Sequence, residues 1–558
     1  MTLKSLVFSL TGHTLSPQSR RSLAGIGLAC FTWAAHADTL PITPEEVELG
    51  RRIYMEGILS DGKPLQGKRM NDVQVEGDTA ACVSCHKRSG MGSLEGNIPA
   101  PPVTGRFLFA KDDNRPIALL DQRAPKNVTR AHIPYTEQTF AKALRQGVNV
   151  AERTMNPLMP QYDLRDKELK AVIAYLQQLS AEVSPGVEED SVHFATVVTP
   201  GVSQAQRLAL EGMMRAVFAQ RNASQQVYSG RMRMPLDLLP RTLRNWELTV
   251  WELNGAPETW AAQLAEYYKK QPVFALISGI SNTTWAPVDT FCQRQKVPCL
   301  LPSIAMAPEK TDFYPVYYSR GVALEADVLA KHLRSQNKPS VKRIVQVNRD
   351  DEIGRGAAQA LTKAMQDSGI NIENRVFNPE NAANKALLND LSKQDSVMLW
   401  LRSADLTALQ KAMPKSPAAN VWVSGFLANE NYAFATKGWQ KQLKVIYPYE
   451  LGKTREKNAA AMKSWLKTWK LPLVDEMMQS EVFFDLLFLT DLSSQMLDNL
   501  YRDYMVERAE DMLSYGSNVS AYPHLSLSRG QRFASKGAYI AHVSANGKLV
   551  AESEWLVP

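Results

Sequence analysis

The chain has 558 residues, too many for one ordinary hydrophobic core, so its length predicts two or three domains. Hydrophobic residues make up 44% of it and charged residues 22%, a composition that argues against a largely disordered protein. The formal charge is +7, but Lys4, Arg20 and Arg21 lie in a segment that we expect to be removed, and no acidic residue precedes Asp38. Loss of these three positive charges leaves +4, which indicates neither nucleic-acid binding nor a polybasic membrane anchor.

The N-terminal segment, residues 1–37, is typical of a signal peptide. A basic pair at 20–21 precedes the apolar run 23–35, and a small-x-small triplet ends at Ala37. We therefore expect cleavage after about Ala37 and export to the periplasm. The apolar run is too short to span a membrane comfortably and no other stretch is long enough, so no membrane span is expected. An alternative to cleavage after Ala37 is that Cys30 is a lipoprotein cysteine and carries a lipid.

The first folded region is expected over residues 38–183. Residues 43–46 form a capping box with proline at the first helical position, which is a strong helix start. A last helix is predicted from Asp166, because apolar residues recur there at the spacing of one helix face. The middle, residues 60–130, is rich in glycine, proline and short polar runs, and is predicted to be mostly loop.

The most specific motif in the chain is Cys82-Val83-Ser84-Cys85-His86. Two thiols at this spacing match the two vinyl groups of a haem, and the adjacent histidine is placed to bind the iron. A redox dithiol would precede a helix of a thioredoxin-like unit, and a zinc site would need a second ligand pair nearby; the sequence shows neither. We therefore expect one covalently bound haem c, held by thioether bonds to Cys82 and Cys85, with His86 as an axial iron ligand.

The region that contains this motif, residues 38–183, resembles the class I cytochromes c. Gly50 and Tyr54 stand four apart in the first predicted helix, residues 173–176 (Ile-Ala-Tyr-Leu) match its partner in the last helix, and residues 101–105 look like the family's Pro-x-Leu-x-Gly loop. The resemblance implies an all-α domain. It also implies that the carbonyl of Pro101 accepts a hydrogen bond from the imidazole of His86, and such a bond orients the ring.

The sixth iron ligand is expected from the loop before the last helix. Residues 156–162 (Asn-Pro-Leu-Met-Pro-Gln-Tyr) resemble the family's Met-Pro distal loop, which makes Met159 the second axial ligand. Methionine sulfur raises the reduction potential and leaves no open coordination position. Met155, Met91 and His132 are the alternatives, although Met91 follows His86 too closely to reach the opposite haem face easily.

A second pattern begins after a Pro-Gly and acidic linker at residues 184–191. From 192 to 558 apolar strands alternate with helices, which predicts parallel sheets covered by helices, in two lobes because of the length. The expected strands are 194–198, 248–253, 273–278, 297–301, 343–347, 396–400, 420–424 and 444–448. The expected helices are 204–220, 257–269, 284–295, 322–335 and 353–368. Asn546-Gly547 between short alternating runs predicts a hairpin.

Residues 192–558 resemble the type I periplasmic binding proteins, especially the branched-chain amino-acid group. The resemblance rests on the strand 194–198 before a helix, a crossover at 313–321, Asp351 and Gly354 before a long helix, and residues 530–533 (Gly-Gln-Arg-Phe). It implies two doubly wound α/β lobes with a ligand cleft between them.

Two serines in the predicted strand-end loops are candidate ligand contacts. Open α/β sheets bind ligands beyond the carboxyl ends of their strands, and Ser281 and Ser303 follow two such strands. By the resemblance, these hydroxyls would hold a ligand carboxylate; the alternative is that they only cap the following helices. Trp285 and Tyr318 either line the same cleft or pack in the core.

Cys292 and Cys299 remain after the haem and signal cysteines are set aside. In an oxidising compartment a disulfide between them is expected, with two separate buried thiols as the alternative.

Three functions follow from these features. The first is a periplasmic mono-haem electron carrier whose binding-protein-like half takes a small solute or a redox partner, such as a dehydrogenase or oxidase. The second is an importer-type solute-binding protein with an accessory haem domain. The third is an enzyme such as a peroxidase, but peroxidases of this type usually carry two haems and an open iron. The single Cys-x-x-Cys-His motif and the methionine Met159 disfavour catalysis.

Overall fold

The first region combines five helices of the described chain with short strands. The computed structural model describes residues 42–558 except 97, 111–132, 232–243, 336–340, 381–386, 411–419, 431, 433–436, 516–518 and 529. The expected signal peptide, Cys30 and His132 lie outside the described residues. The helices are α1 (Pro44–Glu56), α2 (Val83–His86), α3 (Gly105–Leu108), α5 (Glu137–Gln146) and α6 (Asp166–Gln178).

The expected all-α region also contains two small antiparallel sheets. One has the order β2-β1-β5, and the other pairs β3 with β4. The strands are β1 (Gln66–Lys68), β2 (Gln74–Glu76), β3 (Ser93–Glu95), β4 (Ile98–Ala100) and β5 (Gln161–Tyr162). Each has only two or three residues, too few for sequence alternation to indicate a strand, but their backbone hydrogen bonds satisfy polar groups of the loop-rich middle.

Helices α1 and α6 cross where the sequence places Gly50. A Cβ atom on Gly50 would lie 2.0 Å from the carbonyl oxygen of Ala171, so only glycine permits this approach. One turn later the ring of Tyr54 packs on Tyr175 at 5.3 Å between centroids. The Tyr54 hydroxyl donates a hydrogen bond of 2.7 Å to the carbonyl of Lys87, next to the haem motif. The crossing therefore positions the motif as well as the two helices.

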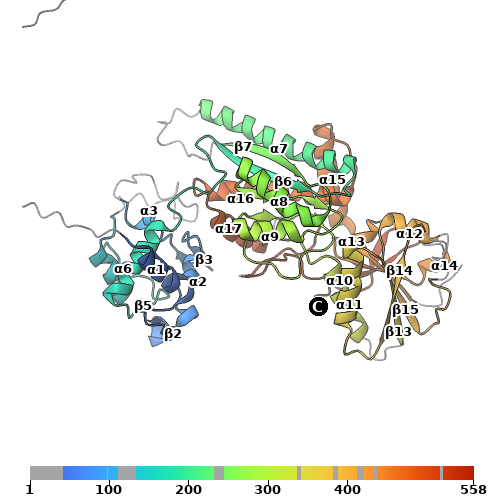
Figure 1. Cartoon of the computed structure of the whole chain (residues 1–558), viewed down its shortest axis with the longest axis horizontal. Coiled ribbons are helices and arrows are strands. Elements are labelled where there is room, and N and C mark those ends of the chain that lie inside the picture. The colour runs from blue at the N-terminus through green and yellow to red at the C-terminus, as the bar shows by residue number, and fades with distance from the viewer. Residues whose placement is uncertain are drawn as a thin grey trace, which may run out of the picture. The chain divides into compact units, whose positions relative to one another are not determined.

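The next region contains a parallel sheet covered by helices, as predicted. Its strand order is β11-β9-β6-β8-β10-β12, with β7 beside β6. Every residue of β6 is buried, as expected for a parallel strand covered on both faces. The strands are β6 (Ser191–Val198), β7 (Asn245–Glu252), β8 (Ala275–Ile277), β9 (Ile280–Ser281), β10 (Cys299–Leu300), β11 (Ser303–Ile304) and β12 (Pro315–Val316). Figure 1 shows the helices α7 (Gln204–Arg231), α8 (Trp260–Lys270) and α9 (Ala286–Gln295) against these strands.

A second sheet has the order β14-β13-β15-β16-β17-β18-β19. Its strands run parallel up to β17, and the last two are antiparallel. They are β13 (Arg343–Arg349), β14 (Asn371–Phe377), β15 (Asp395–Trp400), β16 (Asn420–Ser424), β17 (Leu443–Tyr447), β18 (Tyr539–Val543) and β19 (Leu549–Ala551). The helices are α10 (Val322–Ser335), α11 (Glu352–Ala364), α12 (Ser403–Gln410), α13 (Gly425–Ala428), α14 (Lys437–Gln440) and α15 (Gly452–Thr468). The hairpin predicted at Asn546-Gly547 is confirmed, since it joins β18 to β19.

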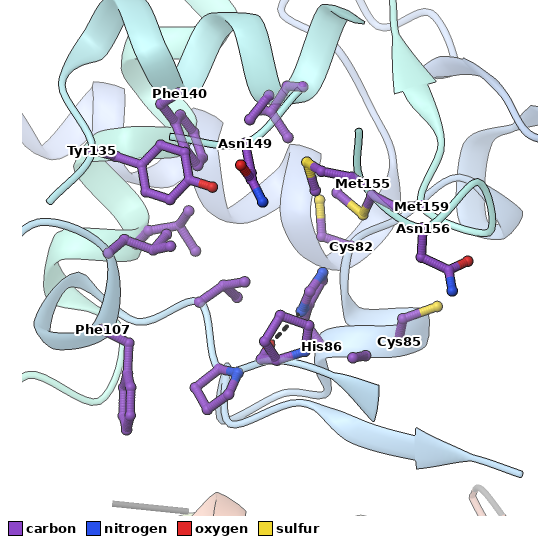
Figure 2. A pocket seen from close by; sticks show the side chains of 18 of the residues that line it. Cys82, Cys85, His86, Phe107, Tyr135, Phe140, Asn149, Met155, Asn156 and Met159 are labelled. Carbon is purple, nitrogen blue, oxygen red and sulfur yellow. Dashed lines mark hydrogen bonds between the residues drawn. The ribbon is translucent and has the colours of Figure 1, made fainter. Parts of the chain in front are cut away.

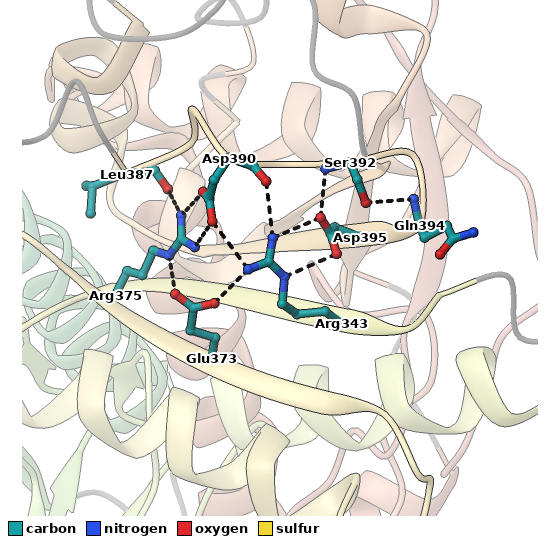
Figure 3. Close-up of polar contacts among 8 residues, drawn as sticks. All are labelled: Arg343, Glu373, Arg375, Leu387, Asp390, Ser392, Gln394 and Asp395. Carbon is teal, nitrogen blue, oxygen red and sulfur yellow. Dashed lines mark hydrogen bonds and ion pairs between the residues drawn. The ribbon is translucent and has the colours of Figure 1, made fainter.

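Edge strand β14 is largely polar, and an ion-pair network adds to its few apolar contacts (Figure 3). Arg343 on β13 binds Asp395 at 2.9 Å, Glu373 at 3.0 Å and Asp390 at 3.3 Å, while Arg375 on β14 binds Asp390 at 2.7 Å. The hydrogen bonds from Arg343 lower the pKa of Asp395 to about 2. Several charges share this network, so it stabilises the edge more than an isolated surface pair would.

The chain crosses between the two sheets more than once. The predicted crossover 313–321 lies against residues 530–533, because Tyr317 donates its backbone N–H to the carbonyl of Arg532 (2.8 Å) and its carbonyl accepts from Ala534 (3.0 Å). Two further helices, α16 (Glu476–Met496) and α17 (Arg502–Tyr515), come between β17 and β18 of the second sheet in sequence, and α16 packs on α7 and β11 of the first.

The predicted disulfide is confirmed. Cys292 in α9 and Cys299 in β10 are bonded, with their Cα atoms 6.2 Å apart, and both side chains are buried. None of the described helices is both long and apolar enough to cross a membrane.

Candidate functional site

The Cys-x-x-Cys-His motif forms one wall of a cavity of about 570 Å³ (Figure 2). Its residues lie on and just before the short helix α2, so Cys82, Cys85 and His86 line the same space. The apolar part of the lining includes Ile98, Pro99, Pro102, Val103, Leu108, Phe140, Leu144, Val172 and Leu176. A concave apolar site with a few convergent polar groups is the usual form of a cofactor pocket.

His86 is oriented by the loop that follows β4. Its Nδ1 lies 2.9 Å from the carbonyl oxygen of Pro101, so the hydrogen bond implied by the resemblance is present. The carbonyl can only accept, which makes Nδ1 the protonated nitrogen and leaves the Nε2 lone pair for another partner. Burial lowers the pKa of His86, which favours the neutral imidazole that iron requires.

The donor set fits a haem better than a zinc ion or a redox dithiol. Burial raises the pKa of the Cys82 thiol to about 12, whereas redox cysteines need a lowered thiol pKa. Among the described residues, no group of three or more histidine, cysteine, aspartate or glutamate side chains could hold a metal ion. Two thiols, a neutral imidazole and an apolar lining remain, and together these match covalent haem.

Two methionines lie in the cavity wall as candidates for the second axial position. Met155 and Met159 both line it, and Figure 2 shows them beside Cys82. Asn156 shapes the turn between them, since its side-chain oxygen accepts from the N–H of Leu158 (3.0 Å) and its carbonyl from that of Met159 (2.9 Å). Met91 is instead fully buried in the large apolar core and is not among the lining residues.

The loop after His86 has anchors that the sequence did not reveal. The carboxylate of Glu507 on α17 accepts from the backbone N–H of Ser89 at 3.0 Å and from its hydroxyl at 2.5 Å. Arg88 pairs with Asp503 at 3.4 Å. Met91 belongs to the apolar cluster that also contains strand β6. Helix α17 therefore holds the segment that begins directly after the haem-binding motif.

A second cavity, of about 240 Å³, lies at the strand ends of the two sheets. Ser281 on β9 and Ser303 on β11 both line it, together with Arg402 before α12 and Tyr449 after β17. Both serines therefore lie at strand ends of the first sheet, where the sequence analysis placed them. We call this space the interlobe cavity.

The hydroxyl protons of both serines are directed to groups of the protein itself. Ser281 donates to the carbonyl of Thr284 (3.1 Å) and accepts from the Thr199 hydroxyl (2.8 Å). Ser303 donates to the carboxylate of Glu481 (2.5 Å). Glu481 also lines the cavity, and sequence analysis missed it. Its signal was available, because α16 is largely apolar yet carries Glu481 and Asp485 one turn apart.

The two aromatic candidates are core residues rather than cavity lining. Trp285 is buried in the cluster beneath β6 and β8. Tyr318 lies behind the interlobe cavity, where its hydroxyl donates to Asp485 and lies 3.0 Å from the carbonyl oxygen of Glu481. It therefore supports the wall that carries Glu481.

Comparison with protein families gives two matches. Residues 78–180 match the cytochrome c family model, and residues 244–480 match the model described as periplasmic binding protein. Comparison with curated protein sequences gave no match.

Solved structures similar to this chain include three substrate-binding or transporter proteins. A fatty acid ABC transporter substrate-binding protein from Thermomonospora curvata is 13% identical, with a TM-score of 0.47, over 68% of this chain and 95% of its own. A substrate-binding periplasmic protein from Ralstonia solanacearum is 13% identical, with a TM-score of 0.48, over 64% and 99%. A branched chain amino acid ABC transporter from Thermus thermophilus with bound valine is 9% identical, with a TM-score of 0.48, over 66% and 97%.

Proposed function

We propose that this chain, which combines a cytochrome c domain with a periplasmic binding protein domain, is a periplasmic electron carrier with one haem and a solute-binding half. The observation that carries the proposal is the convergence of Cys82, Cys85, His86 and Met159 on one apolar cavity. The signal-like segment 1–37 and the disulfide between Cys292 and Cys299 support an oxidising compartment.

Three residues of the motif would hold the haem directly. Cys82 and Cys85 would form its two thioether bonds. His86 would bind iron through Nε2, because its Nδ1 is hydrogen-bonded to Pro101. When bound, haem supplies one-electron exchange between ferrous and ferric iron. The mostly apolar lining would limit the contact of the bound group with water.

Met159 favours electron transfer over catalysis. A thioether on the second axial face would close the position that a peroxidase keeps open for its substrate. A methionine ligand also suits exchange with a dehydrogenase or an oxidase, the redox partners that we propose.

The second candidate function is an importer-type solute-binding protein with an accessory haem. The interlobe cavity favours it, because a buried carboxylate faces a space large enough for a small molecule. The two functions differ in whether the haem exchanges electrons with a partner or only stabilises the fold.

The test is redox titration of the full chain purified from a periplasm that attaches haem. We expect one covalent haem per chain, reversible one-electron reduction, the absorption band of an iron–methionine bond, and oxidation by a small soluble electron acceptor. Turnover of hydrogen peroxide would instead support the enzyme alternative. A chain without covalent haem would overturn the proposal.

A further inference from the structure

Glu481 is a buried carboxylate at the wall of the interlobe cavity. Its side chain is 5% exposed, and its two oxygens accept from the hydroxyls of Tyr522 (2.8 Å) and Ser303 (2.5 Å). Both partners are neutral, and each carboxylate oxygen has capacity for a further hydrogen bond. A carboxylate buried without a cation is costly, so this position favours a positively charged partner.

The other charged groups of the lining do not supply that partner. Arg402 pairs with Asp351 at 2.7 Å and donates to the carbonyl of Asn282, so its charge is already balanced. Asp475 adds a second carboxylate to the lining, where it accepts from Gln206 at 3.0 Å. The lining therefore carries an excess of negative charge, which would oppose a ligand carboxylate.

The serine hydroxyls lead to the same conclusion. A hydroxyl has a single proton, and Ser281 and Ser303 donate theirs to Thr284 and Glu481. Neither serine offers a ligand carboxylate a hydrogen-bond donor in this arrangement. The oxygen of Ser303 keeps lone pairs that can accept from an ammonium N–H, beside the carboxylate that would receive the charge.

We propose that the interlobe cavity binds a small organic ammonium ion, with Glu481 as the receptor of its charged group. The proposal rests on the solute-binding half of the proposed function. The lining also contains aromatic and thioether side chains, among them Phe426, Tyr449, Met477 and Met478, and aromatic faces attract cations. Its other polar side chains, Gln206, Asn282, Ser403 and Asn429, are neutral. A cavity of about 240 Å³ has room for a short alkylamine or arylalkylamine. Burial raises the pKa of Glu481 to about 7, an effect that a bound cation would reverse.

The test measures calorimetric binding and thermal shifts of the full haem-loaded chain with four probes of similar size. These are n-butylammonium, n-butanol, butyrate and the zwitterion valine. We expect binding of n-butylammonium and no binding of butyrate or butanol. Glu481→Gln should weaken butylammonium binding roughly tenfold to a hundredfold, the effect of losing one charged hydrogen bond. Glu309→Gln is the matched control, since that glutamate is exposed and pairs with Lys363.

The probe series on the unaltered chain keeps the test decisive if the Glu481 variant does not fold. Binding of butyrate, or of valine in preference to butylammonium, would overturn the ammonium assignment while leaving a solute-binding half in place. Absence of binding by all four probes would also overturn it. Haem content and redox titration of the same sample would then decide separately whether the electron-carrier proposal stands.

Discussion

His86 and Pro101, fifteen positions apart in sequence, are joined by a hydrogen bond of 2.9 Å from the imidazole Nδ1–H to the carbonyl oxygen. The bond fixes both the ring orientation and the tautomer, so the nitrogen that faces the cavity is the one with a lone pair. A loop residue thus prepares the histidine for iron before any haem is attached.

Replacement of both motif cysteines should abolish covalent haem. In Cys82→Ala/Cys85→Ala no thioether bond can form, and the first region should fail to fold, because much of its apolar surface lines the cavity that the haem would fill. Acid-acetone extraction followed by absorption spectroscopy measures the attached haem. Retention of haem by the extracted double variant would contradict the proposed attachment.

Met159 should occupy the sixth coordination position. Met159→Ala should leave haem attached, lower the reduction potential, and permit binding of cyanide or carbon monoxide, because the iron loses its soft thioether ligand. Met155→Ala is the matched control, since this second thioether lines the same cavity. If Met155→Ala lowers the potential and permits cyanide binding while Met159→Ala does neither, the ligand is Met155.

The strand and helix pattern could be predicted where apolar periodicity was strong. Strands β6 and β15 are buried along their whole length and matched the prediction closely. Strand β14 was missed because three consecutive polar residues, 373–375, interrupt its apolar ones, and two of them form ion pairs, so its hydropathy does not alternate as in a half-buried strand. Helix α16 was missed because apolar residues cover most of its surface and no amphipathic stripe remains.

The two candidate sites differed in predictability. The haem motif is local in sequence, so Cys82 to His86 could be recognised without a fold. The interlobe cavity depends on residues far apart: Ser303 and Glu481 are 178 positions apart and meet only because the chain crosses back between the sheets. Sequence analysis could therefore locate the strand-end serines. It could not show that their hydroxyl protons are donated to other groups of the protein, Thr284 and Glu481.

Removal of the disulfide should destabilise the binding-protein half modestly. Cys292 and Cys299 close a loop of only seven positions, so the loss of constraint on the unfolded chain is about 2 kcal/mol. Cys292→Ala/Cys299→Ala should therefore lower the free energy of urea unfolding by about that amount, with a small addition for lost packing. Chemical reduction of the unaltered chain serves as the control, and an unchanged unfolding curve in both experiments would contradict the prediction.

Glu325 should make the stability of the binding-protein half depend on pH. It is fully buried, accepts from the Ser424 hydroxyl (2.5 Å) and the Phe426 N–H (3.0 Å), and burial raises its pKa from 4.5 to about 8. Between these values the unfolded state has lost the proton and the folded state keeps it, so stability falls as pH rises and levels off above 8.

The variant Glu325→Gln tests this dependence, because its amide is neutral at every pH. Relative to the unaltered chain, the variant should gain unfolding free energy as pH rises from 4.5 to 8. Urea unfolding across this range measures the difference. Glu481 and Glu507 also have raised pKa values, but they are present in both proteins and cancel in the comparison. Parallel stability curves would rule out the assignment to Glu325.

The last prediction concerns separation of the chain at the linker 184–191. Residues 192–558 should fold without haem, because every proposed haem ligand lies upstream and the disulfide and both sheets remain. Residues 38–183 should carry one haem but melt at a lower temperature than in the full chain. The reason is Met91, which is fully buried in the core of the full chain and would become exposed.

Exposure of a fully buried methionine costs about 1.5–3 kcal/mol, and the fragment would also lose the bonds from Ser89 to Glu507. Met91→Ser in the fragment should leave the haem spectrum unchanged and cost little stability, because position 91 is exposed there. The same substitution in the full chain should lower its stability by burying a polar hydroxyl in an apolar core. Thermal unfolding followed at the haem absorption compares the four proteins. Equal melting temperatures for the fragment and the full chain would mean that the contacts of Met91 and Ser89 do not stabilise the haem-binding region. An insoluble 192–558 fragment would mean that the two regions form a single folding unit.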